Sequence, residues 1–224
     1  MTRTPGRSRV VFALAVVIGA CTSAPPVPDW KTNASAAIEQ AVAAYLAGDT
    51  RRADSEFDRA RREVARTGRP ELVGRAELVR CAARIASLVF EPCEGFENLR
   101  ADAAAPERAY ADYLAARLQS PDIALLPAQH RAVAATSLTA GDATATLRGI
   151  EDPLSRLVAI GVLFQAGRAN PAAIALAVDT ASAQGWRRPL LAWLNVQRAL
   201  ADKAGDAQES ERLRRRIATV QGER

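Results

Sequence analysis

Alanine accounts for 49 of the 224 residues, about a fifth of the chain, while aromatic residues make up only 5%. Alanine has the highest helix propensity of the amino acids, whereas strands are enriched in β-branched and aromatic residues. No stretch of the sequence sustains the alternation of apolar and polar residues that a half-buried strand requires. We therefore expect an all-α fold of antiparallel helical hairpins, stacked as a solenoid or as a right-angled helical bundle.

The overall composition narrows the class of protein. Charged residues make up 25% and hydrophobic residues 49% of the chain, which excludes intrinsic disorder, a disulfide-dense mini-protein and a multi-pass membrane protein. A chain of this length can bury a core as one domain or as two small ones. The formal net charge of +5 at pH 7 makes nucleic-acid binding a hypothesis to test against the positions of the basic residues.

The first twenty residues have the pattern of an export signal. An unbroken apolar run occupies residues 10–18, and the basic residues before it are Arg3, Arg7 and Arg9. About nine apolar residues are too few to span a bilayer, which needs roughly 20, but they match the apolar core of a signal peptide. Residues 1–20 are therefore predicted to be a signal peptide.

The apolar run ends in Ile18-Gly19-Ala20-Cys21, which resembles the lipobox of bacterial lipoproteins. In that family the leader is cut before the cysteine, which is diacylated and then acylated on its new amino group. The resemblance implies cleavage between Ala20 and Cys21, lipidation of Cys21, and a membrane anchor made of several acyl chains. The alternative is an ordinary secretory signal that ends by chance near a cysteine.

The residues after the lipobox indicate a destination and a tether. Lipoproteins retained in the inner membrane usually have Asp after the lipidated cysteine, and this chain has Thr22. The resemblance therefore implies a protein on the outer membrane that faces the periplasm. Residues 21–31 are proline-rich and are predicted to be an extended tether.

Cleavage of the leader removes three of the 30 basic residues and leaves 27 basic against 25 acidic residues. The mature chain is therefore only weakly basic, and we expect no nucleic-acid partner.

Two cysteines remain, Cys81 and Cys93, and the periplasm is oxidising. Cys81 lies in a helix predicted over about residues 70–90, and Cys93 follows the helix-breaking Pro92. The positions favour a disulfide, which would stabilise the fold by roughly 3 kcal/mol. The alternative is two free thiols, one of them buried in a helix-packing face. A metal site is not expected, because two cysteines and the single His130 cannot supply a zinc ligand set.

Glycine and proline positions divide the mature chain into helices. Predicted helix ends follow alanine-rich or amphipathic runs, at glycines 48, 68, 141, 149, 167, 185, 205 and 222. Asp152-Pro153 and Asn170-Pro171 each place a capping side chain before a proline in the first helical turn. We expect an amino-terminal helical region over residues 32–120, an irregular connector over 121–149 and a carboxy-terminal helical region over 150–224. One continuous curved stack is the alternative to two regions.

Residues 34–68 carry a family resemblance. Ala44-Tyr45-Leu46-Ala47-Gly48-Asp49 is followed at helical spacing by Ala53, Phe57, Ala60 and Val64, which form one apolar stripe. Outside the stripe, Asp58 and Arg62, and Arg59 and Glu63, are spaced for ion pairs. This segment resembles the tetratricopeptide repeat (TPR). That repeat has an aromatic residue in its first helix, a Gly-Asp turn, and small residues around a second aromatic in its second helix. Tyr45 stands one residue closer to Gly48 than is usual in that family. The resemblance implies a TPR-like hairpin over residues 34–68.

Weaker echoes of the repeat follow in the carboxy-terminal region. One begins at Leu157 and includes Gly161 and Phe164, and another begins at Leu194. A spacing of about 36 residues is typical of helical solenoids. The resemblance therefore implies TPR-like hairpins over residues 150–224.

No catalytic constellation emerges from the sequence. His130 is the only histidine, and the chain has neither a G-x-S-x-G elbow nor a nucleotide-binding loop. His130 is expected to be a surface or packing residue, and no cofactor is predicted. Glu209-Ser210 matches the start of the lytic transglycosylase motif, but the Gly-Leu-Met-Gln-like element that should follow is missing. Glu209 is also predicted to lie in a charged, solvated helix, where a carboxyl group makes a poor general acid.

The remaining candidate site is a cluster near the carboxyl terminus formed by Trp186, Arg187, Arg188 and Trp193. The two tryptophans are expected to pack between helices, and the alternative is that an exposed tryptophan anchors a partner. Arg187 and Arg188 are candidates for the edge of a partner-binding groove. TPR-type lipoproteins typically act as adaptors in envelope assembly or with peptidoglycan hydrolases. We therefore expect a membrane-anchored, non-catalytic scaffold that binds another envelope protein or peptide. The alternatives are a peptidoglycan-active enzyme of the lytic transglycosylase type and a purely structural envelope lipoprotein.

Overall fold

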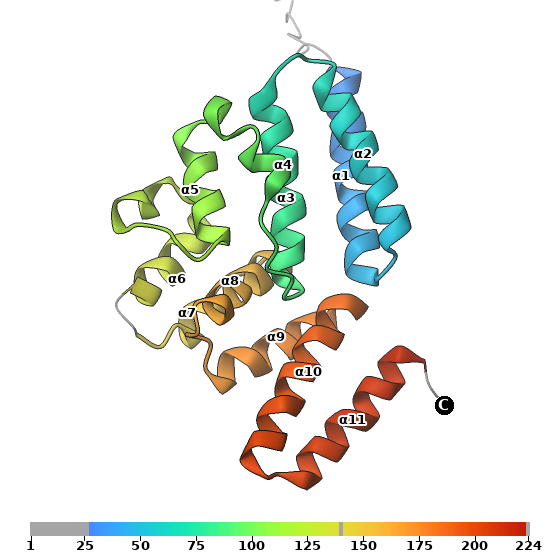
Figure 1. Cartoon of the computed structure of the whole chain (residues 1–224), viewed down its shortest axis with the longest axis vertical. Coiled ribbons are helices and arrows are strands. Elements are labelled where there is room, and N and C mark those ends of the chain that lie inside the picture. The colour runs from blue at the N-terminus through green and yellow to red at the C-terminus, as the bar shows by residue number, and fades with distance from the viewer. Residues whose placement is uncertain (1–26, 139–140, 223–224) are drawn as a thin grey trace, which may run out of the picture.

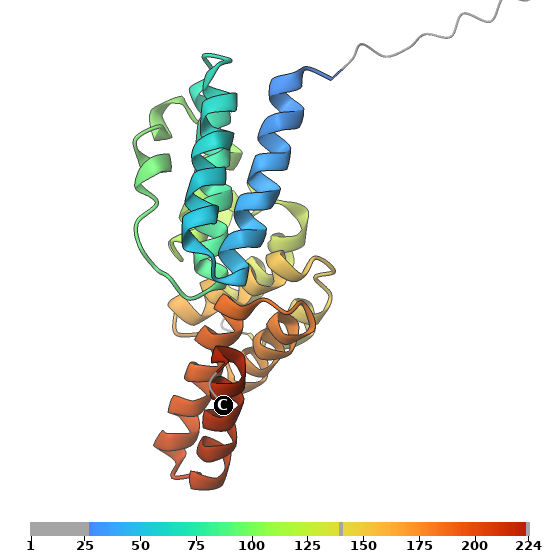
Figure 2. The ribbon, with the colours of Figure 1, turned by 90° about the vertical axis from the view of Figure 1, so that its right-hand side faces the viewer.

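The computed structural model describes residues 27–138 and 141–222, and within these ranges it contains helices and no strand. The predicted all-α fold is confirmed. The helices stack into an elongated body in which α1 begins at one end and the turn between α10 and α11 forms the other (Figures 1 and 2). None of the described helices is long and apolar enough to cross a membrane.

The first hairpin consists of α1 (Asp29–Ala47) and α2 (Thr50–Ala65). Gly48 ends α1 in the left-handed conformation with φ 96°, and the Asp49 carboxylate accepts a hydrogen bond from the Arg52 amide at 3.1 Å. The apolar stripe predicted for the second helix is the buried face of α2. The ion pairs expected between Asp58 and Arg62 and between Arg59 and Glu63 do not form among the described residues. Arg59 pairs with Glu56 instead, at 3.2 Å.

The start of this hairpin differs from the prediction. Residues 29–31, assigned to the tether, form the first turn of α1, so the hairpin begins at Asp29 and not at residue 34. Pro28 lies just before the helix, where a missing amide hydrogen has no cost. Asp29 adds a negative charge that the positive helix end favours. The part of the tether before residue 27 lies outside the described residues.

The middle of the chain surrounds α3 (Pro70–Ala86). This helix stops before the predicted end near residue 90, because Leu88 adopts a left-handed conformation with φ 60° and the Val89 amide bonds back to the Arg84 carbonyl. The elements that follow are α4 (Glu94–Glu97), η1 (Arg100–Asp102), α5 (Ala105–Leu114), η2 (Ser120–Leu125), α6 (Ala128–Leu138) and α7 (Thr144–Arg148). The connector predicted over residues 121–149 thus includes α6, which has 11 residues.

Four helices complete the body: α8 (Pro153–Gln165), α9 (Pro171–Ala183), α10 (Arg187–Ala204) and α11 (Ala207–Gln221). Asp152, Asn170 and Asp206 cap α8, α9 and α11, and each side chain accepts a hydrogen bond from a backbone amide. The caps expected at Asp152 and Asn170 are therefore confirmed.

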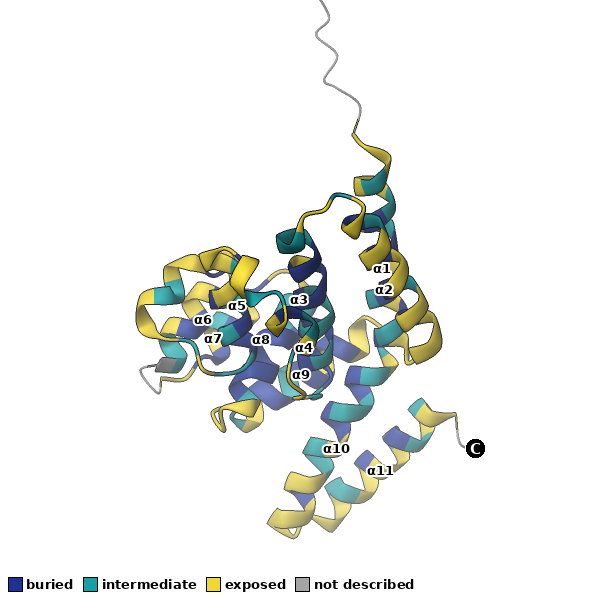
Figure 3. Cartoon of the chain, turned by 45° about the horizontal axis from the view of Figure 1, so that its top comes forward, coloured by how far each residue is buried: buried dark blue, intermediate teal, exposed yellow. Residues whose placement is uncertain are grey.

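One main core runs through both helical regions. It extends from Leu78 in α3 to Ile217 in α11. Helix α8 packs against α3 (Figure 3), and the two backbones approach closely near the carboxyl end of α3. A smaller cluster of Ala34, Val64 and Val73 fills the first hairpin where it meets α3. The main core is therefore continuous across the predicted connector.

Candidate functional site

The residues of the predicted lipobox, including Ala20 and Cys21, lie outside the described residues. The two remaining cysteines lie within them. Cys81 in α3 and Cys93 before α4 form a disulfide with their Cα atoms 5.9 Å apart, in agreement with the pairing that the sequence favours. The bond closes the segment between α3 and α4 onto the side of α3.

Trp193 is a core residue and not an exposed anchor. Its side chain is fully buried, and its indole Nε1 donates a hydrogen bond to the Ala86 carbonyl at 3.1 Å. The ring also packs edge-on against Phe164, with centroids 5.5 Å apart. Trp186 is half-buried against the same core. Of the two roles considered for Trp193, packing between helices agrees with its burial, and its indole reaches the last residue of α3.

The two arginines of the cluster bind the protein itself. Arg188 donates from Nε to the Tyr45 carbonyl at 2.6 Å and from Nη2 to Thr50 Oγ1 at 2.7 Å. Its guanidinium also lies over the Tyr45 ring, 4.2 Å from the centroid. Arg187 donates to the Gln221 carbonyl at 3.1 Å. Arg188 thus joins α10 to the first hairpin, and the four residues do not form one exposed surface.

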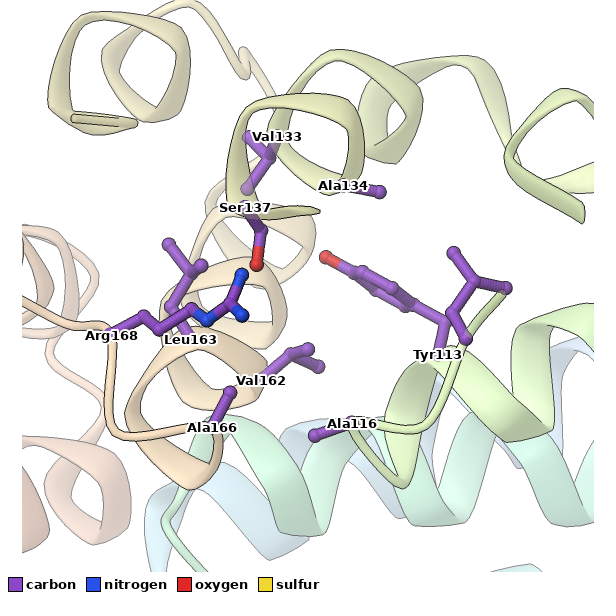
Figure 4. Close-up of a pocket in the computed structure, with 10 residues that line it drawn as sticks. Tyr113, Ala116, Val133, Ala134, Ser137, Val162, Leu163, Ala166 and Arg168 are labelled. Atoms are coloured by element: carbon purple, nitrogen blue, oxygen red, sulfur yellow. The ribbon is translucent and has the colours of Figure 1, made fainter. Parts of the chain in front are cut away.

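A cavity that the sequence did not reveal lies between α5, α6 and α8 (Figure 4). It has a volume of about 250 Å³. Most of its lining is apolar, and the buried part of that lining includes Val133, Ala134, Val162 and Leu163. Three polar groups face the same space: the hydroxyls of Tyr113 and Ser137, and the guanidinium of Arg168. An apolar cavity with a few convergent polar groups is the usual form of a small-molecule site.

A buried cluster of three rings, those of Tyr110, Tyr113 and His130, lies at the polar end of the cavity. The Tyr113 hydroxyl and His130 Nδ1 form a hydrogen bond of 3.3 Å, and the two rings lie 5.0 Å apart. Tyr110 packs against both of these rings. Burial lowers the pKa of His130 to about 4, so this histidine is neutral at neutral pH. Burial likewise raises the pKa of Tyr113, which therefore keeps its hydroxyl hydrogen.

Arg168 differs from most arginines of the chain. It is exposed in the turn between α8 and α9, and its side chain has no ion pair or hydrogen bond within residues 27–138 and 141–222. By contrast, exposed arginines such as Arg66, Arg69 and Arg214 pair with a nearby glutamate. The cavity rim therefore holds a cation whose hydrogen-bonding capacity is open to a ligand.

Sequence reasoning missed this cavity for a physical reason. Tyr113, Ser137 and Arg168 belong to three separate segments and match no motif. The spacing of His130, Val133 and Ser137 is that of one helix face, which was the only signal available. That signal was weak because the surrounding prolines and threonines pointed to an irregular connector.

Glu209, the other residue considered for chemistry, lies on the surface of α11. Its carboxylate accepts two hydrogen bonds from Arg212, both at 2.6 Å. The Arg212 guanidinium lowers the pKa of Glu209, which is therefore ionised at neutral pH. A general acid needs the opposite shift. Within the described ranges there is also no group of three or more His, Cys, Asp or Glu side chains placed to hold a metal ion.

No protein-family model, curated protein or solved structure matches the chain.

Proposed function

We propose that the protein is a lipid-anchored scaffold on the outer membrane that faces the periplasm and binds another envelope protein or peptide. The proposal combines the lipobox-like sequence that ends at Cys21 with the stack of helical hairpins. A rigid stack presents a large surface to a partner without any catalytic group.

The observation that supports this function best is the position of α1. This helix begins at the end of the body opposite the α10–α11 turn (Figures 1 and 2). Only eight peptide units separate Cys21 from Asp29, and at about 3.5 Å per residue they reach at most about 28 Å. An anchor at Cys21 would therefore hold the start of α1 near the membrane and direct the α10–α11 hairpin into the periplasm.

Helix α11 packs mainly against α10, at the end of the body. Only Leu213 and Ile217 of α11 are buried, and they pack toward α10. Near the free end of the hairpin, Leu200 is 41% exposed, one of few large apolar side chains exposed in the described part of the chain. An apolar side chain on a projecting hairpin is suited to act as an anchor for a partner.

Site-specific photocrosslinking in living cells tests this orientation. We expect a crosslinker at position 200 to capture one reproducible envelope protein. A crosslinker at Arg69, in the surface pocket it shares with Asp29 and Trp30 near the start of α1, should not capture that protein. Equal capture from both positions, or capture from neither, would contradict the scaffold proposal and favour a purely structural lipoprotein.

The anchor itself is tested by fractionation. We expect Cys21→Ser to release the protein from the membrane fraction or to leave its leader uncleaved. Unchanged fractionation with a cleaved leader would refute lipidation. The peptidoglycan-hydrolase alternative predicts that the purified protein releases muropeptides from cell-wall sacculi and that Glu209→Gln abolishes this release. We expect no release from either protein.

A further inference from the structure

We propose that the cavity between α5, α6 and α8 binds a small monocarboxylate with a compact apolar body. The carboxylate would lie between the Tyr113 hydroxyl, the Ser137 hydroxyl and the Arg168 guanidinium, and the apolar body would fill the space lined by Val133, Val162 and Leu163. This site is independent of the membrane anchor and of the α10–α11 hairpin.

The size of the cavity restricts the ligand. A volume of about 250 Å³ lies just below the range of about 300–1,000 Å³ usual for small-molecule pockets. It corresponds to roughly eight water molecules at about 30 Å³ each. A ligand the size of one aromatic ring or a short branched chain would fit, and a peptide or a full-length acyl chain would not.

The polar groups determine the charge of the ligand. Arg168 supplies one positive charge, and neither hydroxyl is ionised, since burial raises the pKa of Tyr113. One cation balances a monoanion but leaves a dianion such as a phosphate monoester with an unpaired charge in a partly dry site. The planar guanidinium also matches a carboxylate, which it can bind with two parallel hydrogen bonds.

The Tyr113 hydroxyl can donate to a ligand when His130 carries its hydrogen on Nδ1. His130 is buried and neutral, so its Nδ1 either accepts a hydrogen from Tyr113 or donates one to the phenol oxygen. In the second arrangement the Tyr113 hydrogen is free to bond a ligand oxygen. The ring contacts of Tyr113 with Tyr110 and His130 hold the hydroxyl in position before the ligand enters.

Binding of benzoate to the purified full chain tests the site. Calorimetric titration should give saturable binding at one site, and the backbone amide resonances that shift should include those of Ser137 and Leu163. Benzamide, which has the same shape without the charge, should bind at least tenfold more weakly. Phenylphosphonate, which approaches a dianion, should also bind more weakly than benzoate.

Variants separate the roles of the groups. Arg168→Gln and Tyr113→Phe should each weaken benzoate binding about tenfold or more. Arg148→Gln, which changes an exposed arginine in α7 that does not line the cavity, should leave the affinity unchanged. Arg168 is exposed, so its replacement should not alter the melting temperature. The proposal fails if benzoate does not bind at millimolar concentration, if benzamide binds equally well, or if Arg148→Gln has the same effect as Arg168→Gln.

Discussion

Gly161 in α8 lies so close to α3 that a methyl group on its Cα would come within 2.5 Å of the carbonyl oxygen of Ile85. The neighbouring atom belongs to the backbone, so it cannot move aside as the end of a side chain could. This contact lies at the crossing that joins the two helical regions through one core. The small residue that resembles a TPR position is therefore required here by the approach of two backbones.

Gly161→Ala should destabilise the fold by about 2 kcal/mol, because overpacking costs about 1–3 kcal/mol and exceeds the gain in helix propensity. Gly74→Ala in α3 is the matched control. A methyl group at Gly74 would meet Phe96 at 3.5 Å, an ordinary contact, so that variant should be neutral or slightly more stable. Urea unfolding of the three proteins measures the difference. Equal stabilities of the two variants would contradict the proposed contact.

Reduction of the Cys81–Cys93 disulfide should lower the free energy of unfolding by roughly 3 kcal/mol, because the unfolded chain regains the entropy of an open loop. Thermal melting with and without a reducing agent measures this loss. The double variant Cys81→Ala/Cys93→Ala should melt near the temperature of the reduced protein and should not respond to the reducing agent. A reductant effect that persists in the double variant would show that another group is responsible.

Acidification should destabilise the protein through His130. Its pKa is about 4 in the folded state because of burial, against about 6.5 in an unfolded chain, so the unfolded state binds the proton more readily. The stability that this histidine contributes at pH 7 should therefore fall as the pH drops from about 6.5 to 4, by up to about 3 kcal/mol. Urea unfolding across this range should show the slope in the natural protein and a flatter one in His130→Asn. Equal slopes would refute a buried, neutral histidine.

Removal of the Arg188 side-chain contacts should loosen the first hairpin from α10. Arg188→Gln loses the bonds to Tyr45 and Thr50, and we expect a destabilisation of roughly 1–2 kcal/mol. Arg187→Gln, one residue away, loses only an exposed bond to the end of α11 and should have little effect. Hydrogen exchange should be faster in α1 and α2 of the Arg188 variant alone. Identical exchange in both variants would exclude this role for Arg188.

Local features of the chain could be predicted from sequence alone. The high alanine content gave the helical class, and the caps at Asp152 and Asn170 followed from side chains that bond amides three residues away. The buried stripe of α2 was also recognisable, because the periodicity of one helix determines which face is apolar. The helical class, the caps and the buried stripe all depend on interactions between residues a few positions apart, so they can be read from the order of the residues.

Only the tertiary structure decided how distant segments meet. Arg188 and Tyr45 are 143 positions apart, and no local pattern indicated that an apparent partner-binding arginine would stabilise the first hairpin. The burial of Trp193 against Ala86 and the convergence of Tyr113, Ser137 and Arg168 on one cavity have the same origin. Such arrangements depend on which helices pack against each other. Helix periodicity determines which face of a helix is buried but not which helix covers it.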